Sequence, residues 1–146
     1  MGLDMYLILN RDVSKYLEDD EGTIEAIRAV GGRDLEPRSI TYRAAYWRKA
    51  NQIHKWFVDN VQDGRDDCQK YYVGKDSLQK LVDLCKRAEA VQASAGEILP
   101  PSEGFFFGST KIDDGYWYDI RQTIEQLEAA LSVAGKFDYF EYYASW

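Results

Sequence analysis

His54 is the only histidine in the chain, and this limits the chemistry that the sequence can support. A zinc site with two His ligands and a mechanism with two imidazoles are both excluded. A nucleophilic pair with Cys68 is conceivable, but no nucleophile elbow or thiol-activating pattern surrounds that cysteine. Because His54 falls on the apolar face of an expected helix, we interpret it as a hydrogen-bonded core residue, with a functional role left open.

Two acidic clusters invite comparison with metal sites. The three acids of Asp63–Asp67 lack the alternating spacing, central Gly and distal Glu of a calcium loop, so we expect a solvated turn. Asp113, Asp114 and Asp119 stand at the start of an expected helix, where acids cap N–H groups and stabilise the helix dipole. A metal site that adds Glu103 to them is the less favoured alternative. We therefore predict no metal ion and no cofactor.

The segment Gly104–Thr110 has two glycines four residues apart, followed by hydroxyl side chains. In a P-loop the spacing is one residue longer, and Lys and then Ser or Thr follow the second glycine directly. Here Lys111 comes too late, so the three Phe residues predict a buried strand with a turn at each end. Ser109 could still line a ligand site where that strand ends.

Charge is distributed unevenly along the 146 residues, whose net charge is −7. This net acidity argues against general nucleic-acid binding and against a membrane-surface protein. Between Arg38 and Val58, however, there are five basic residues and no acidic one. That segment is either the solvated face of a helix or part of a ligand pocket that holds a phosphate or stacks on a base. The candidate pocket residues are Arg43, Trp47, Arg48, Lys49, Asn51, His54 and Ser109.

The C-terminal third is acidic, with eight acidic and three basic residues from Pro100 onward. Such a surface could meet a basic partner by complementary charge. The chain is also rich in aromatic residues, which dominate the hot spots of protein interfaces. The residues that we expect to contact a partner protein are Trp56, Asp113, Asp114, Tyr118 and Tyr142.

The elements that must position these residues follow from periodicity. Helices are expected over 23–30 and 47–62, from a cap at Asp76 through Ala88, and from Asp113 through Leu131. Strands are expected over 2–10, 70–73, 104–108 and 137–143, and 40–46 is either a strand or the lead-in to the next helix. This order predicts one α+β domain over 1–146, with three main helices on one face of a small, largely antiparallel sheet.

The chain shows no apolar run near the roughly 20 residues that a membrane span needs, and no export signal near its start. Cys68 and Cys85 do not form a disulfide framework, so we expect two reduced thiols. Cys85 falls within an apolar helical stripe and is interpreted as a core residue. These features favour the cytoplasm.

Four motifs carry a resemblance to a known family. They are GLDMYL at the start, YWRKANQIHKWFVDNVQ followed by DDC, LPPSEGFFFGSTKIDD with YWYDI, and the end YYASW. The chain resembles a family of small proteins encoded by phages and prophages, from Gly2 to Trp146, least of all over 13–39, where an insertion is conceivable. The resemblance implies a phage context and brings no catalytic residue with it.

Two functional hypotheses follow. The first is a non-enzymatic phage accessory protein that binds and inhibits a host or defence protein in the host cytoplasm, in the manner of an anti-CRISPR protein. The second is a nucleotide or small-ligand binding protein, with enzymatic activity left open, that uses segment 38–58. Homodimerisation also stays open.

Overall fold

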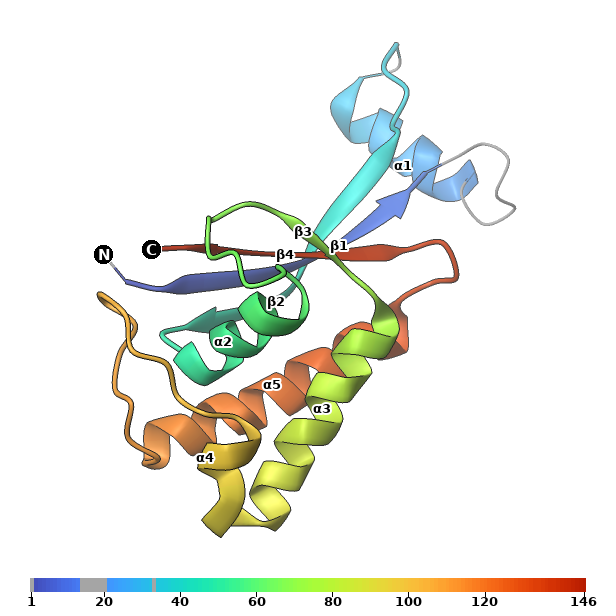
Figure 1. Ribbon diagram of the computed structural model, residues 1–146. Helices are drawn as coiled ribbons and strands as arrows, with labels where there is room; N and C mark the ends of the chain where they lie inside the picture. The colour runs from blue at the N-terminus through green and yellow to red at the C-terminus, as the bar shows by residue number, and fades with distance from the viewer. Residues whose placement is uncertain (1, 14–20, 33) are drawn as a thin grey trace.

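The computed structural model describes residues 2–13, 21–32 and 34–146 (Figure 1). Four strands form one antiparallel sheet in the order β2-β1-β4-β3. Figure 1 shows α2, α3 and α5 together on one side of this sheet. The predicted α+β class, the antiparallel sheet and the three main helices on one face are thereby confirmed.

The elements follow the chain in a mixed order. The strands are β1 (Asp4–Asp12), β2 (Ser39–Arg48), β3 (Tyr71–Val73) and β4 (Tyr139–Ser145). The helices are α1 (Glu21–Gly31), α2 (Asn51–Asn60), α3 (Lys75–Ala90), the 3-10 turn η1 (Gln92–Ser94), α4 (Ala95–Ile98) and α5 (Asp114–Val133). Helix α1 lies beyond the far end of β1 and β2 (Figure 1). Residues 14–20 and 33 of the segment 13–39 lie outside the described residues.

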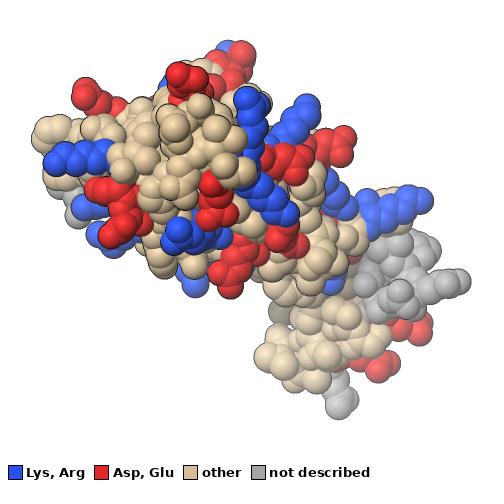
Figure 2. Space-filling view, turned by 90° about the horizontal axis from the view of Figure 1, so that it is seen from below, with Lys and Arg blue, Asp and Glu red and all other residues tan. Residues whose placement is uncertain are grey.

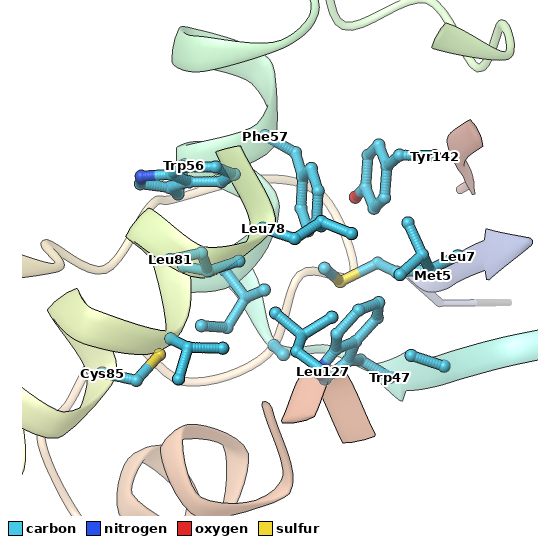
Figure 3. Close-up of a cluster of buried hydrophobic side chains, with 14 of the residues drawn as sticks. Met5, Leu7, Trp47, Trp56, Phe57, Leu78, Leu81, Cys85, Leu127 and Tyr142 are labelled. Atoms are coloured by element: carbon cyan, nitrogen blue, oxygen red, sulfur yellow. The ribbon is translucent and has the colours of Figure 1, made fainter. Parts of the chain in front are cut away.

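Alternation along the strands builds the core. Met5, Leu7 and Leu9 of β1 are buried, and so are Phe140 and Tyr142 of β4, because every second side chain of a strand faces the helices. The Tyr142 ring stacks on Phe57 of α2, with centroids 3.8 Å apart and planes within 4° (Figure 3).

Cys85 of α3 is fully buried among apolar side chains, as its place in the sequence predicted (Figure 3). Burial raises the pKa of its thiol to about 12, so it stays a neutral core residue. Cys68 is exposed, and neither cysteine forms a disulfide.

Segment 40–46 is a strand, one of the two alternatives predicted for it. Three other element predictions are wrong. The strand runs on to Arg48, so Trp47 belongs to β2, and the helix expected over 47–62 begins only at Asn51. Helix α3 begins at Lys75 after an extended Gly74, which leaves Asp76 inside the first turn instead of at the cap. Segment 104–108 is a turn, not a buried strand, and Phe105 is 84 % exposed.

Folding also disperses the charge that is segregated in the sequence. Figure 2 shows Lys and Arg interspersed with Asp and Glu over the helical side of the molecule. The acids of the C-terminal third are mostly occupied: Asp113 caps α5, Asp119 is half-buried, Glu128 pairs with Lys86, Asp138 pairs with Arg11, and Glu141 accepts from Asn10. The expected acidic contact surface is therefore not formed as a unit. None of the described helices is both long and apolar enough to cross a membrane.

Asp138 provides a test of the packing at the end of β1. Its carboxylate accepts two hydrogen bonds from Arg11 Nε and Nη2, and the bond from Arg11 lowers its pKa. A lowered pKa stabilises the fold above the unfolded value of 3.8, and this stabilisation is lost as pH falls through the folded pKa. Asp138→Asn should cost about 1–2 kcal/mol at pH 7, as measured by urea unfolding, and progressively less as the pH falls below 3.8. A cost that is independent of pH would contradict this account.

Candidate functional site

The buried side chain of Asn51, at the start of α2, holds the loop that precedes α5. Its Nδ2 donates to the carbonyls of Phe107 and Ser109 at 3.1 and 2.9 Å, and its Oδ1 accepts from Ser102 N–H at 3.0 Å. These bonds use both donors and one acceptor position of the amide. The loop is therefore attached at three points to a helix of the core.

This attachment displays a turn with two exposed aromatic rings. Phe107 N–H donates to the carbonyl of Gly104 and closes the turn, while Phe107 itself is buried. Phe105 and Phe106 are 84 % and 45 % exposed, and their rings meet edge to face at 4.5 Å. A Cβ on Gly104 would lie 2.3 Å from the Phe107 ring, so only glycine fits there. We call Gly104–Phe107 the aromatic turn.

Two of the four described non-glycine residues with positive φ lie around the aromatic turn, and the other two, Asp63 and Cys68, lie in the 61–70 loop. Phe106 has φ +67°, a conformation that turns normally give to Gly or Asn. Lys49, between β2 and α2, has φ +59°. The two residues are linked through Leu3, because Lys49 N–H donates to the Leu3 carbonyl and Leu3 N–H donates to the Phe106 carbonyl. Non-glycine residues in this region cost about 1–3 kcal/mol each and concentrate at functional sites.

A cleft of about 300 Å³ lies beside the aromatic turn. It is formed by the end of β2, the start of α2, segment 108–111 and the first turns of α5. Its lining includes the cations Arg48, Lys49 and Lys111, which make no side-chain ion pair within the described residues. Tyr118, 62 % exposed, stands at the α5 side. We call this the basic cleft.

Asp119 also lines the basic cleft, at its α5 side. Burial raises the pKa of its carboxyl to about 6, against a hydrogen bond from Gln52 Nε2 that lowers it. The Asp113 carboxylate, which also lines the cleft, raises this pKa further. The cleft thus has a cationic side, formed by Arg48, Lys49 and Lys111, and an acidic side on α5.

Three of the residues predicted for a ligand pocket come together in the basic cleft: Arg48, Lys49 and Ser109. Arg48 and Lys49 belong to the basic segment 38–58, and Lys111 was not among the predicted residues. The cleft forms only because the 108–111 loop folds back onto α2, and hydrophobic periodicity does not predict that contact.

The other predicted pocket residues lie elsewhere. Trp47 is buried, with its indole N–H donating to Thr123 Oγ1 at 2.9 Å. Asn51 and His54 are buried as well, and Arg43 lies over the Tyr46 ring at 5.7 Å. The full set therefore does not converge on one pocket, and the small-ligand hypothesis keeps only part of its residues.

His54 is a hydrogen-bonded core residue, as its place on an apolar face predicted. Its Nδ1 lies 2.7 Å from Tyr142 Oη, and its Nε2 lies 3.0 Å from Asp66 Oδ2. Because the Asp66 carboxylate can only accept, His54 Nε2 carries the hydrogen of that bond, and in this tautomer Nδ1 accepts from the Tyr142 hydroxyl. Asp66 also accepts from Trp146 Nε1. These hydrogen bonds tie β4 and the 61–70 loop to α2. Because Tyr142 is fully buried, its hydroxyl is not accessible to a substrate.

The predicted protein-contact residues are divided by the fold. Trp56 and Tyr142 are buried, so their prediction as contact residues is wrong. Asp113 is the N-cap of α5 and accepts from Gly115 N–H and Tyr116 N–H. Tyr118 and Asp114 remain exposed. The residues that sequence reasoning missed are Phe105 and Phe106, because a run of three Phe is typical of a buried strand.

The sheet face opposite α2, α3 and α5 carries a ladder of aromatic rings. Tyr6 stacks on Tyr143 at 4.8 Å and contacts Tyr46 at 5.4 Å, while Lys70 and Arg43 cover the two ends. Ring faces that are occupied by each other and by cations are not available to a base. This ladder stabilises the sheet and does not form a platform for nucleic acid.

Comparison with protein-family models, curated proteins and solved structures found no match to the chain. Within the described residues, no group of three or more His, Cys, Asp or Glu side chains could hold a metal ion. Asp66 and Asp67 of the acidic turn instead bond to Trp146 and Tyr71.

Asn51→Ala tests whether the amide holds the aromatic turn. Loss of three buried hydrogen bonds should destabilise the protein by about 2–3 kcal/mol and speed amide hydrogen exchange over 102–110 more than in the sheet. Asn51→Asp is the control with the same side-chain shape. It keeps the oxygen that accepts from Ser102 N–H, but it replaces the donor to the Phe107 and Ser109 carbonyls with a second oxygen. Equal amide exchange over 102–110 in Asn51→Ala and wild type would show that the Asn51 side chain does not hold this loop in place.

Asp119→Asn tests the desolvated carboxyl. A raised pKa means that the folded state holds the proton more tightly, so ionisation costs stability as pH rises from about 4 to above 6. Asp119→Asn should therefore raise the melting temperature by about 3 °C at pH 7.5, corresponding to about 1 kcal/mol after solvent screening. The gain should vanish near pH 4, and a gain that persists there would contradict desolvation as its cause.

Proposed function

We propose that this protein is a non-enzymatic phage accessory protein that binds and inhibits a host or defence protein through its aromatic turn. The observation that carries the proposal is the pair Phe105 and Phe106, exposed on a loop that Asn51 attaches to the core. A strained aromatic residue held toward solvent opposes stability, which favours a binding role for it.

The surroundings of the turn indicate the chemistry of the partner. Arg48, Lys49 and Lys111 lie in the adjacent cleft and make no side-chain ion pair in the described chain. Asp113 and Asp119 line the α5 side of the same cleft. A matching surface has an apolar pocket for the two rings and carboxylates beside it. The proposed contact surface is therefore the aromatic turn and the basic cleft, and not the acidic side chains of the C-terminal third. The phage context implied by the resemblance, and a host cytoplasm as its location, belong to the same proposal.

Phe106→Gly separates binding from folding. Glycine adopts positive φ without strain, so the melting temperature should stay constant or rise, while loss of the ring should weaken partner binding at least about tenfold. Wild type, Phe106→Gly and Phe105→Ser are immobilised, and proteins captured from phage-host lysate are compared by quantitative mass spectrometry.

Tyr72→Ser is the matched control, since Tyr72 is an aromatic residue 69 % exposed on β3, away from the turn. Partners that are lost with both Phe variants and kept with Tyr72→Ser support the proposal. Identical capture profiles for all four proteins would refute it. A melting shift of wild type with nucleotides, removed by Arg48→Ala, would instead favour the small-ligand hypothesis.

A further inference from the structure

The outer edge of β2 already holds a peptide-like group. β2 is an end strand of the sheet, so its outer edge has no neighbouring strand within the described chain. At Tyr46, however, the backbone N–H donates to Gln126 Oε1 at 2.9 Å, and Gln126 Nε2 donates to the Tyr46 carbonyl at 3.1 Å. The carboxamide of α5 thus makes the pair of bonds that the peptide groups of a fifth strand would make.

Beyond this point the edge opens onto a groove of about 430 Å³ between the sheet and the end of α5. Ala44 of β2 and Ala129 and Ala130 of α5 keep it open, because their side chains are small. Tyr42 and Val133 expose apolar surface at the groove, at 44 % and 67 %. The remaining lining residues are Leu9, Arg11 and Arg43.

We propose that this groove takes an extended segment of a partner protein, added to β2 as a fifth strand. The β2 ladder shifts register at Ala44, because Leu7 faces Ala45 and Ile8 faces Arg43. Main-chain bonds to the β2 edge on the Ser39–Arg43 side of this bulge would supply affinity, and alternate apolar side chains would enter the groove beside α5. The site lies apart from the aromatic turn and goes beyond the function proposed above.

Charge determines which occupant fits. Two arginines line the groove, but Arg11 is paired with Asp138, and the guanidinium of Arg43 lies over the Tyr46 ring on the opposite face of the sheet. A segment is therefore complementary when it alternates apolar residues, which enter the groove, with a carboxylate, which reaches Arg43 on the opposite face. A second copy of this chain is disfavoured, because β2 contains Arg43 and Arg48 and no acid, so that β2–β2 pairing would bring like charges together.

The test uses a displayed library of random ten-residue peptides, selected on the wild-type protein. Selected peptides should alternate apolar residues with at least one Asp or Glu, and on binding should shift backbone amide NMR signals of 40–46 and 129–133. Ala129→Trp should fill the groove and weaken the selected peptides at least about tenfold, whereas Ser132→Trp, on the same helix but outside the lining, should not.

Three results would overturn the inference. They are selected peptides that bind Ala129→Trp and wild type equally, amide shifts confined to other strands, and a concentration-dependent dimer that the peptides dissociate, which would assign the edge to a second copy. Phe106→Gly should bind the same peptides with unchanged affinity. Failure of the aromatic turn and failure of the groove are therefore distinguishable.

Discussion

The buried amide of Asn51 is the interaction on which the rest of the candidate site depends. It is placed by the change from strand to helix at Lys49, and it joins that point to the carbonyls of Phe107 and Ser109. Without this amide, the long connection between α4 and α5 would lose three of the hydrogen bonds that hold it in one conformation. With it, the aromatic turn, the basic cleft and the first turns of α5 share one fixed geometry, so binding there need not pay again for ordering the loop.

Polar groups inside this small protein join elements that apolar packing alone would leave free to shift. The chain from Tyr142 through His54 to Asp66 and Trp146 connects the last strand, the central helix and the 61–70 loop. Each buried polar group in this series has a hydrogen-bond partner. A buried polar network that is fully hydrogen-bonded favours one arrangement of the fold, whereas an unpaired group in it would destabilise the protein. A histidine, a tyrosine and a carboxylate in series resemble catalytic machinery, yet burial of the hydroxyl makes them structural.

On the surface, some groups have interaction partners within the protein and others have none. The tyrosine ladder across the open sheet face uses its ring faces internally, and the acids of the C-terminal third are mostly caps, ion pairs or half-buried groups. Among the parts without a partner in the described chain are the aromatic turn with its neighbouring cations, and the outer edge of β2 past Gln126. Unsatisfied apolar rings, cations and strand edges are the features that association with another protein can satisfy.

Sequence by itself determined the fold class, the three main helices, the core position of Cys85 and the cap at Asp113, since periodicity and capping chemistry act within a few residues. It favoured a core position for His54 and left a functional role for that residue open. It also gave three residues of the basic cleft. Only the tertiary structure decided that Trp47 belongs to a strand, that Trp56 and Tyr142 are buried, and that Phe105 and Phe106 are exposed. Those outcomes depend on long-range contacts, above all between Asn51 and residues more than 50 positions away, and no local pattern encodes which hydrogen bonds a distant amide will make.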